Sequence, residues 1–190
     1  MNTEFCFVRH GRTDCNISML IQGRIDNPLS ELGKKDPICV AELIKKYNLD
    51  FDIIICSPLS RAKDTANIIK NHLQLDIPII INPDFIEREF GSAEGAPITP
   101  ENYEKVMNND FEGMEKDYEI CKRTKNGLFK LLKEYEGKKI LVVCHSHVIK
   151  SLFMQFSDNV KFNSKFGYHS INLLSFNGYN LLDCKFSIES

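Results

Sequence analysis

Four short apolar runs divide the chain, and each is hydrophobic at every position instead of at alternate ones. They cover residues 5–8, 53–56, 79–81 and 140–144. Continuous apolar runs of this length are typical of strands that are buried on both faces, as in the middle of a parallel sheet. We therefore expect four buried strands.

Segments with helical spacing separate these runs. Apolar side chains recur every three or four positions within residues 40–47, 62–73 and 128–135, which is the spacing of one face of an α-helix. Strand and helix thus alternate along the chain. This order predicts a three-layer α/β/α domain with a mainly parallel central sheet.

Two dipeptides that end in proline predict the starts of helices. Ser57-Pro58 and Asp36-Pro37 both resemble an N-cap followed by the first helical residue. Pro37 should also make its helix start late or kink, because proline lacks the N–H that a helix interior needs.

The remaining segments complete one expected domain over residues 1–190. Residues 170–176 and 179–187 flank Asn177-Gly178 and predict a hairpin at the edge of the sheet. Residues 92–100 are rich in Gly, Ala and Pro, and we expect the stretch from residue 92 to about 117 to form a lid on the surface. The length and the 43% hydrophobic content suit one full-sized core.

Charge and cysteine content exclude several functions. The formal net charge is −2, with no separate run of Lys or Arg, so nucleic acid and anionic membranes are not expected partners. No basic leader precedes the first apolar run, and no apolar run reaches the roughly 18 residues that cross a bilayer. The seven cysteines lack C-x-x-C spacing and indicate reduced thiols without a metal site or disulfide frame. We expect a cytoplasmic protein.

Chemically active side chains follow the ends of the predicted strands. In open α/β sheets, ligands gather outside the carboxyl ends of the strands. The candidate residues that the four runs bring to this edge are Arg9, His10, Arg61, Glu87 and His145. Two arginines, two histidines and one carboxylate are sufficient for phosphoryl transfer without a metal.

Each of these residues has a role that its chemistry suggests. The forked guanidinium groups of Arg9 and Arg61 suit the oxygens of a phosphoryl group. His10 can attack phosphorus as a neutral imidazole. Glu87 can protonate the leaving group and later activate water, and His145 can stabilise the charge of the transition state.

The order of these motifs resembles the histidine phosphatase superfamily, in the branch of the cofactor-dependent phosphoglycerate mutases and their small phosphatase relatives. The similar strings are residues 8–13, 57–66, 87–91 and 143–145, and together they span most of the chain. The resemblance implies a metal-independent enzyme of the same α/β fold, without a cofactor. It implies His10 as the nucleophile that becomes phosphorylated, Arg9, Arg61 and His145 as phosphate ligands, and Glu87 as proton donor.

The resemblance also suggests where the organic part of the substrate binds. Asn16 and the Gln22-Gly23 turn match positions that line the substrate pocket of relatives, and Ser57 lies in a matching string. The family usually has small residues after the second histidine, whereas this chain has Ser146-His147. His147 is therefore either a specificity residue or the first turn of a helix.

Spacing favours a phosphatase over a mutase. Mutases of this branch have a sizeable insertion between the acid and the second histidine, but Glu87 and His145 are only 58 positions apart. Residues 92–119 carry eight acidic side chains against Lys105 and Lys116. A lid of this composition should repel a second phosphate, so we expect a small monophosphate ester or a neutral-tailed substrate.

Other interpretations stay open at this stage. Mutase-type phosphoryl transfer and a phosphate-binding regulatory domain without turnover fit the same arginines. Cys6 and Arg12 have the spacing of a tyrosine phosphatase loop, although Phe7 and Val8 continue the strand past the thiol. The hairpin at the end of the chain is either a free edge or the contact of a homodimer.

Overall fold

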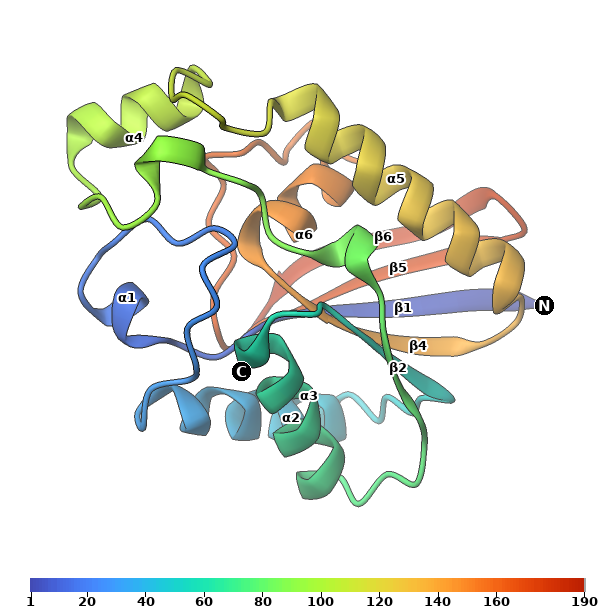
Figure 1. Cartoon of the computed structure of the whole chain (residues 1–190). Coiled ribbons are helices and arrows are strands. Elements are labelled where there is room, and N and C mark those ends of the chain that lie inside the picture. Colours follow the sequence, from blue (N-terminus) through green and yellow to red (C-terminus); the bar gives the residue numbers. More distant parts are fainter. Residues whose placement is uncertain (190) are drawn as a thin grey trace.

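The computed structural model describes residues 1–189, and in it a central sheet lies between two layers of helices (Figure 1). This part of the chain forms six strands in the order β3-β2-β4-β1-β5-β6. The strands are β1 (Asn2–Arg9), β2 (Ile53–Cys56), β3 (Ile79–Ile81), β4 (Lys139–Cys144), β5 (Ile171–Asn177) and β6 (Asn180–Ile188). The helices are α1 (Asp14–Ile17), α2 (Asp36–Lys46), α3 (Ser60–His72), α4 (Pro100–Met107), α5 (Asp117–Glu134) and α6 (Ser146–Phe153). Three 3-10 turns are η1 (Gly33–Lys35), η2 (Pro83–Phe85) and η3 (Gly91–Ala93).

The four apolar runs are the four parallel strands, as predicted. β4 pairs in parallel with β1 and with β2, and β2 pairs in parallel with β3. Their carboxyl ends therefore lie at the same edge of the sheet.

The predicted hairpin is confirmed, but its position differs from the expectation. β5 pairs antiparallel with β1 and with β6. β5 is thus an interior strand, and β6 of this hairpin is the one at the edge. The result is a mainly parallel sheet with an antiparallel margin, a common arrangement.

Both faces of the sheet are covered around β1, β2 and β4, which explains why these strands are continuously hydrophobic. The expectation of a buried strand is wrong for β3, because it lies at the edge of the sheet and leaves Ile80 and Ile81 exposed. Phe5 and Phe7 on β1 pack into a cluster with residues of α5 and α6. Cys6 and Val8 point to the opposite face and pack with residues of α2 and α3. Alternate side chains of one strand therefore serve two separate cores, and the three-layer prediction is confirmed.

The two expected helix caps are wrong by one or two residues. α3 begins at Ser60 with Leu59 as its N-cap, and the Ser57 hydroxyl instead contacts His145. α2 follows the turn η1 and begins at Asp36 itself. The Asp36 carboxylate does not cap the helix, because it is the acceptor for two other side chains. The late start expected from Pro37 is confirmed.

Asp36 ties three segments together. Its carboxylate accepts hydrogen bonds from Arg12 Nε at 2.9 Å and Arg12 Nη2 at 2.6 Å, and it lies 2.7 Å from His169 Nε2. The carboxylate is almost fully buried. Burial alone would raise the pKa of Asp36, but the hydrogen bonds from Arg12 and His169 outweigh it and lower that pKa.

We expect Asp36→Asn to lower the free energy of unfolding by about 3 kcal/mol, because removing one partner of a buried ion pair leaves the other uncompensated. Since the folded-state pKa of Asp36 is depressed, its contribution is present at neutral pH and is lost as the pH falls through that pKa. Urea unfolding at pH 7 measures the difference, which should shrink in acid. Asp64→Asn, at an exposed carboxylate of α3, is the control. Equal midpoints for the two variants would contradict the prediction.

The segment between η3 and α5 stands apart from the two cores. It carries α4 and contributes to a third, small apolar cluster that includes Ile21, Phe90 and Val106. Leu20 forms an isolated antiparallel bridge with Pro97. The segment thus packs against the chain that follows α1, at the end of the molecule where both lie in Figure 1.

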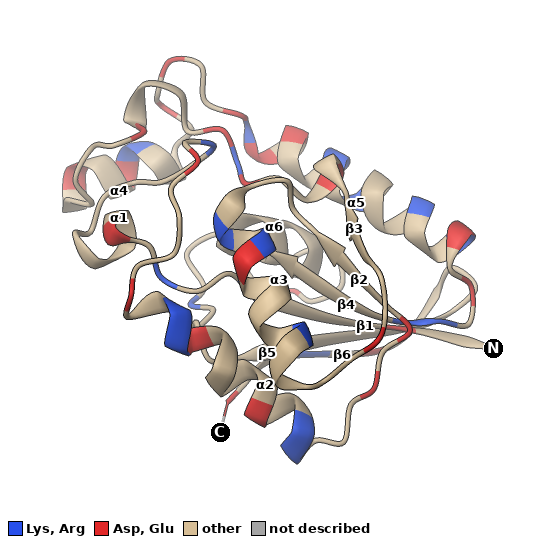
Figure 2. Cartoon of the chain, turned by 60° about the horizontal axis from the view of Figure 1, so that its bottom comes forward, with Lys and Arg blue, Asp and Glu red and all other residues tan. Residues whose placement is uncertain are grey.

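The surface charge and the composition of the helices bear on two expectations, that no basic surface stands apart and that no segment crosses a membrane. α2 and α5 each carry both basic and acidic side chains (Figure 2). Among residues 1–189, no helix is both long enough and apolar enough to pass through a lipid bilayer.

Candidate active site

His10 follows β1 and is held in one tautomer. Its Nδ1 atom lies 2.7 Å from the carbonyl oxygen of Gly11. A carbonyl oxygen can only accept, so Nδ1 carries the proton and Nε2 keeps its lone pair. Burial lowers the pKa of His10 well below its ordinary value, and the charges of Arg61 and Arg9 lower it further. The ring is therefore neutral at physiological pH and presents Nε2 as a nucleophile.

Arg61 lies in the first turn of α3 and is fully buried. Its guanidinium donates to His10 Nε2 at 3.3 Å, to Gly23 O at 2.7 Å and to Ile25 O at 2.9 Å. The loop with these carbonyl groups is held by Glu94, whose carboxylate accepts the N–H groups of Arg24 and Ile25 at 2.8 and 2.9 Å. Glu94 thus positions Arg61 through the loop.

Gly23 therefore serves through its backbone. A Cβ atom there would lie 2.1 Å from Glu94 Oε1, so no larger residue fits. Gly11 is constrained in the same way, since its Cβ would lie 2.3 Å from Gly33 O. This close approach of two backbone segments, and not only access for phosphate, requires glycine after His10.

Arg9 is positioned by a residue that the sequence did not reveal. Its guanidinium carbon lies 3.8 Å from the centre of the Tyr168 ring, and Nη2 donates to the Tyr168 hydroxyl at 2.7 Å. Nε of Arg9 is buried and has no partner among the described residues. The stacked guanidinium is fixed beside His10 and retains a free donor.

His145 completes the cluster from the end of β4. Its Nε2 atom lies 2.7 Å from Ser57 Oγ, and its ring centre lies 5.0 Å from that of His10. Burial lowers the pKa of His145 well below its ordinary value, and His10 and Arg61 add to the effect. Within residues 1–189, its buried Nδ1 has no hydrogen-bond partner. Ser57 thus orients the ring and leaves one nitrogen for a ligand.

Glu87 is buried at the edge of this cluster. One carboxyl oxygen accepts the N–H of Arg88 at 2.9 Å, and the other lies 3.5 Å from the N–H of His147. Burial raises the pKa of Glu87, and the Arg88 N–H and the charges of Arg61 and Arg9 only partly oppose this. A carboxyl group with a raised pKa is suited to give a proton to a leaving group.

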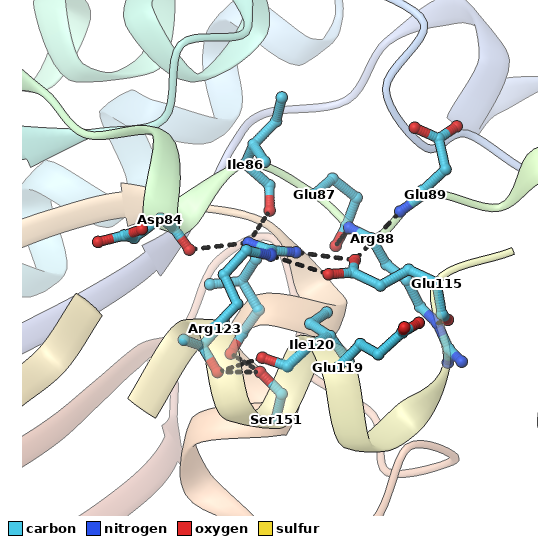
Figure 3. A network of polar contacts seen from close by, with 12 residues as sticks. Asp84, Ile86, Glu87, Arg88, Glu89, Glu115, Glu119, Ile120, Arg123 and Ser151 are labelled. Atoms are coloured by element: carbon cyan, nitrogen blue, oxygen red, sulfur yellow. Dashed lines mark hydrogen bonds and ion pairs between the residues drawn. The ribbon is translucent and has the colours of Figure 1, made fainter. Parts of the chain in front are cut away.

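A network on α5 holds the segment that carries Glu87 (Figure 3). Arg123 donates to the carbonyl oxygens of Asp84 and Ile86 at 2.8 and 2.9 Å. The same guanidinium forms a bidentate ion pair with the Glu115 carboxylate, with both hydrogen bonds at 2.8 Å. No sequence motif marked these two residues, since Arg123 lies on a helix and Glu115 lies in the acidic segment before it, where charged residues are usually solvated.

A cavity of about 240 Å³ adjoins Glu87. Four of the six predicted substrate residues line it: Asn16, Gln22, Ser146 and His147. The other two, Gly23 and Ser57, lie behind Arg61 and His145. The structure thus brings all five catalytic candidates together. The cluster around His10 can hold the phosphate group of a substrate, and the adjoining cavity can hold its organic part.

The position of His147 is compatible with both roles that the sequence left open, a specificity residue and the first turn of a helix. It lies in the first turn of α6, and it also lines the cavity. Its ring packs against Phe90 and Phe162, with ring centres 5.0 and 5.5 Å apart. Burial lowers the pKa of His147 well below its ordinary value, so it is a neutral wall of the cavity.

Cys6 does not fit the tyrosine phosphatase interpretation. The thiol is buried inside β1, and burial raises its pKa far above the ordinary value. A nucleophilic thiol needs the opposite shift. Within residues 1–189, no group of three or more His, Cys, Asp or Glu is placed to hold a metal ion.

Comparison with known families agrees with this geometry. The family model of the histidine phosphatase superfamily (branch 1) matches residues 5–186. The chain belongs to this superfamily. Members of this superfamily act through a phosphohistidine intermediate. The relatives that match most of the chain include named phosphatases, so the chain is a phosphatase and the predicted family is confirmed.

Individual relatives of this histidine phosphatase support the assignment. The uncharacterized phosphatase PhoE of Bacillus subtilis is 39% identical over 155 residues, which cover 82% of this chain and 78% of the relative. A metal-independent phosphoserine phosphatase of Arabidopsis thaliana is 33% identical over 165 residues, with 80% and 68% coverage. The solved structure of YhfR from Bacillus stearothermophilus shares the fold with a TM-score of 0.85 at 21% identity, over 99% of this chain and 98% of that one.

Proposed function

We propose that the protein hydrolyses small phosphate monoesters in two in-line steps, with His10 as the nucleophile. The observation that carries the proposal is the pairing of a neutral His10, with its lone pair on Nε2, and a buried Glu87 with a raised pKa. His10 supplies the lone pair that attacks phosphorus, and Glu87 supplies the proton for the leaving group.

In the first step, His10 Nε2 attacks phosphorus and the bond from phosphorus to the ester oxygen breaks. Glu87 gives its proton to the departing alkoxide. Arg9, Arg61 and His145 donate hydrogen bonds to the other phosphoryl oxygens, whose charge they stabilise in a water-poor site. The product is an alcohol and a phosphorylated His10.

In the second step, the Glu87 carboxylate takes a proton from water. The water oxygen attacks phosphorus, and the bond to His10 Nε2 breaks. Inorganic phosphate leaves, while Glu87 is protonated again and His10 is neutral again. The cycle needs no other acid or base than Glu87.

Transfer to water distinguishes this proposal from a mutase. A mutase must retain a bisphosphate, whereas the segment between Glu87 and α5 holds one helix of eight residues, α4.

With p-nitrophenyl phosphate in EDTA, we expect metal-independent release of nitrophenol and phosphate. With 3-phosphoglycerate plus 2,3-bisphosphoglycerate, we expect inorganic phosphate and no 2-phosphoglycerate. Isomerisation without phosphate release would favour the mutase, and reversible binding without turnover would favour a regulatory domain.

The relatives suggest a starting point for the choice of substrates. A phosphoserine phosphatase and an uncharacterized phosphatase are both similar over most of this chain. Small monophosphates such as phosphoserine therefore belong in the first substrate panel. We also propose a lid function for residues 92–117, because α4 carries residues that line the cavity beside Glu87.

Location and assembly stay predictions. All seven cysteines lie within residues 1–189 and none is paired there, which suits the reducing cytoplasm that we propose as the site of action. A homodimer through the edge strand β6 is the expected assembly if the protein is not a monomer.

A further inference from the structure

A lysine ammonium faces the cavity without an acidic partner. Lys150 lies on α6 and lines the cavity beside Glu87. Its Nζ atom donates one hydrogen bond, to the carbonyl oxygen of Phe162 at 2.8 Å. It forms no ion pair with a carboxylate of residues 1–189. Since an ammonium group has three donors, most of its bonding capacity is unused.

The groups around Lys150 do not neutralise it. Arg9 at the end of β1 adds a second positive charge, and Glu87 is the acidic residue among those that line the described cavity. Burial and, to a smaller extent, the charge of Arg9 lower the pKa of Lys150 to about 8, against the opposing effect of Glu87. Lys150 thus keeps its proton at neutral pH, and the pKa of Glu87 in the same cavity is raised. Burying an unpaired charge is costly, so this arrangement suits an anionic ligand.

The position of Lys150 assigns that anion to the organic part of the substrate. His10, Arg61 and His145 form the phosphate end and do not line the cavity. Glu87, which protonates the leaving group, does line it. The leaving group therefore occupies the cavity, and Lys150 faces it.

The acidic lid does not make the cavity negative. Glu94 is bonded to the backbone of Arg24 and Ile25, and Glu115 to Arg123. Asp117 pairs with Arg88. The sequence-based argument for a neutral-tailed substrate assumed that these carboxylates face the ligand, and the structure removes its basis.

Gln22 supplies a second donor in the same cavity. Its Oε1 accepts the Thr13 hydroxyl at 2.7 Å, which directs Nε2 away from Thr13. Nε2 is buried and has no partner within residues 1–189. The other walls are apolar and include Leu20, Ile21 and Phe162.

On the basis of the proposed function, we propose that the substrate is a phosphate ester whose organic part carries a carboxylate, and that Lys150 binds this group with help from Gln22 Nε2. One ammonium and one amide donor match the single charge and the two oxygens of a carboxylate. A second phosphate, with about two charges, would require a further cation, because Arg9 binds the transferred phosphoryl group and leaves Lys150 as the other cation that lines the described cavity.

The test separates binding from turnover. Calorimetry on His10→Ala compares 3-phosphoglycerate with glycerol 3-phosphate, which has the same length but lacks the carboxylate. We expect the acid to bind about tenfold or more tightly, as charged hydrogen bonds contribute that much. The ratio should fall to near one in His10→Ala/Lys150→Met and persist with Lys150→Arg. His10→Ala/Lys122→Met, at an exposed lysine of α5, is the matched control and should keep the full ratio.

Three outcomes would overturn the inference. They are equal binding of the two esters by His10→Ala, no binding of the acid, and a Lys150-dependent preference for 2,3-bisphosphoglycerate over 3-phosphoglycerate. Turnover measurements decide separately whether the proposed hydrolysis occurs. If p-nitrophenyl phosphate is hydrolysed but the esters bind equally, only the inference fails. If the esters are discriminated but nothing is hydrolysed, only the proposed function fails.

Discussion

Replacing His10 by alanine should reduce kcat for p-nitrophenyl phosphate by about 10³-fold or more, since loss of an attacking group typically has an effect of this size. The aromatic leaving group departs readily, so this loss reports the missing nucleophile and not the proton donor. Steady-state kinetics in EDTA measure it. His72→Ala, at the end of α3 and paired with Glu42 on the surface, is the control and should retain wild-type activity.

Covalent labelling gives the same prediction a second measurement. After rapid acid-free quenching, wild-type protein incubated with a ³²P-labelled ester should carry a label that is stable in alkali and lost in acid, as expected for phosphohistidine. His10→Ala should carry none. Unchanged turnover in His10→Ala, or a label that persists in the variant, would remove His10 from the nucleophilic role.

Glu87→Gln should slow the hydrolysis of alkyl phosphates by about 10²- to 10⁴-fold, because general acid catalysis contributes this much. The amide oxygen can still accept the N–H of Arg88, but the amide cannot supply the proton. With p-nitrophenyl phosphate, the first step needs no proton, so we expect a rapid burst of nitrophenol followed by slow turnover. Stopped-flow absorbance measures the burst. Glu104→Gln, at an exposed position of α4, should behave as wild type.

The pH profile follows from the same carboxyl group. Since burial raises the pKa of Glu87 and its protonated form is the active one, kcat/KM for an alkyl ester should fall as the pH rises through that raised pKa. Burial and the arginines lower the pKa of His10, so activity should persist below the ordinary histidine range before it declines. In Glu87→Gln the fall at high pH should disappear. A fall that remains in the variant would assign it to another group.

Much of the site could be predicted because it depends on strand ends. Strands buried on both faces are visible as unbroken apolar runs, and their carboxyl ends bring Arg9, His10 and His145 to one edge whatever the intervening loops do. Arg61 and Glu87 also follow strands. Arg61 lies in the first turn of α3, shortly after β2, and Glu87 follows β3 after the short turn η2.

The parts that could not be predicted depend on contacts between distant segments. Tyr168 reaches Arg9 across 159 positions of sequence, and no local pattern encodes this pairing. Lys150 looked like an ordinary helical lysine until the cavity beside it was defined. The expected cap at Asp36 failed for the same reason, since Arg12 and His169 compete successfully for its carboxylate.

The hydrogen bond from Arg61 Nε to His10 Nε2 means that the resting enzyme masks its own nucleophile. The lone pair that attacks phosphorus is occupied until an anion draws the guanidinium donor to its own oxygens. Reactivity therefore appears only when a phosphoryl group is present to be attacked. A neutral electrophile that enters the site cannot release the lone pair in this way, so selectivity for phosphate is set before any bond is made or broken.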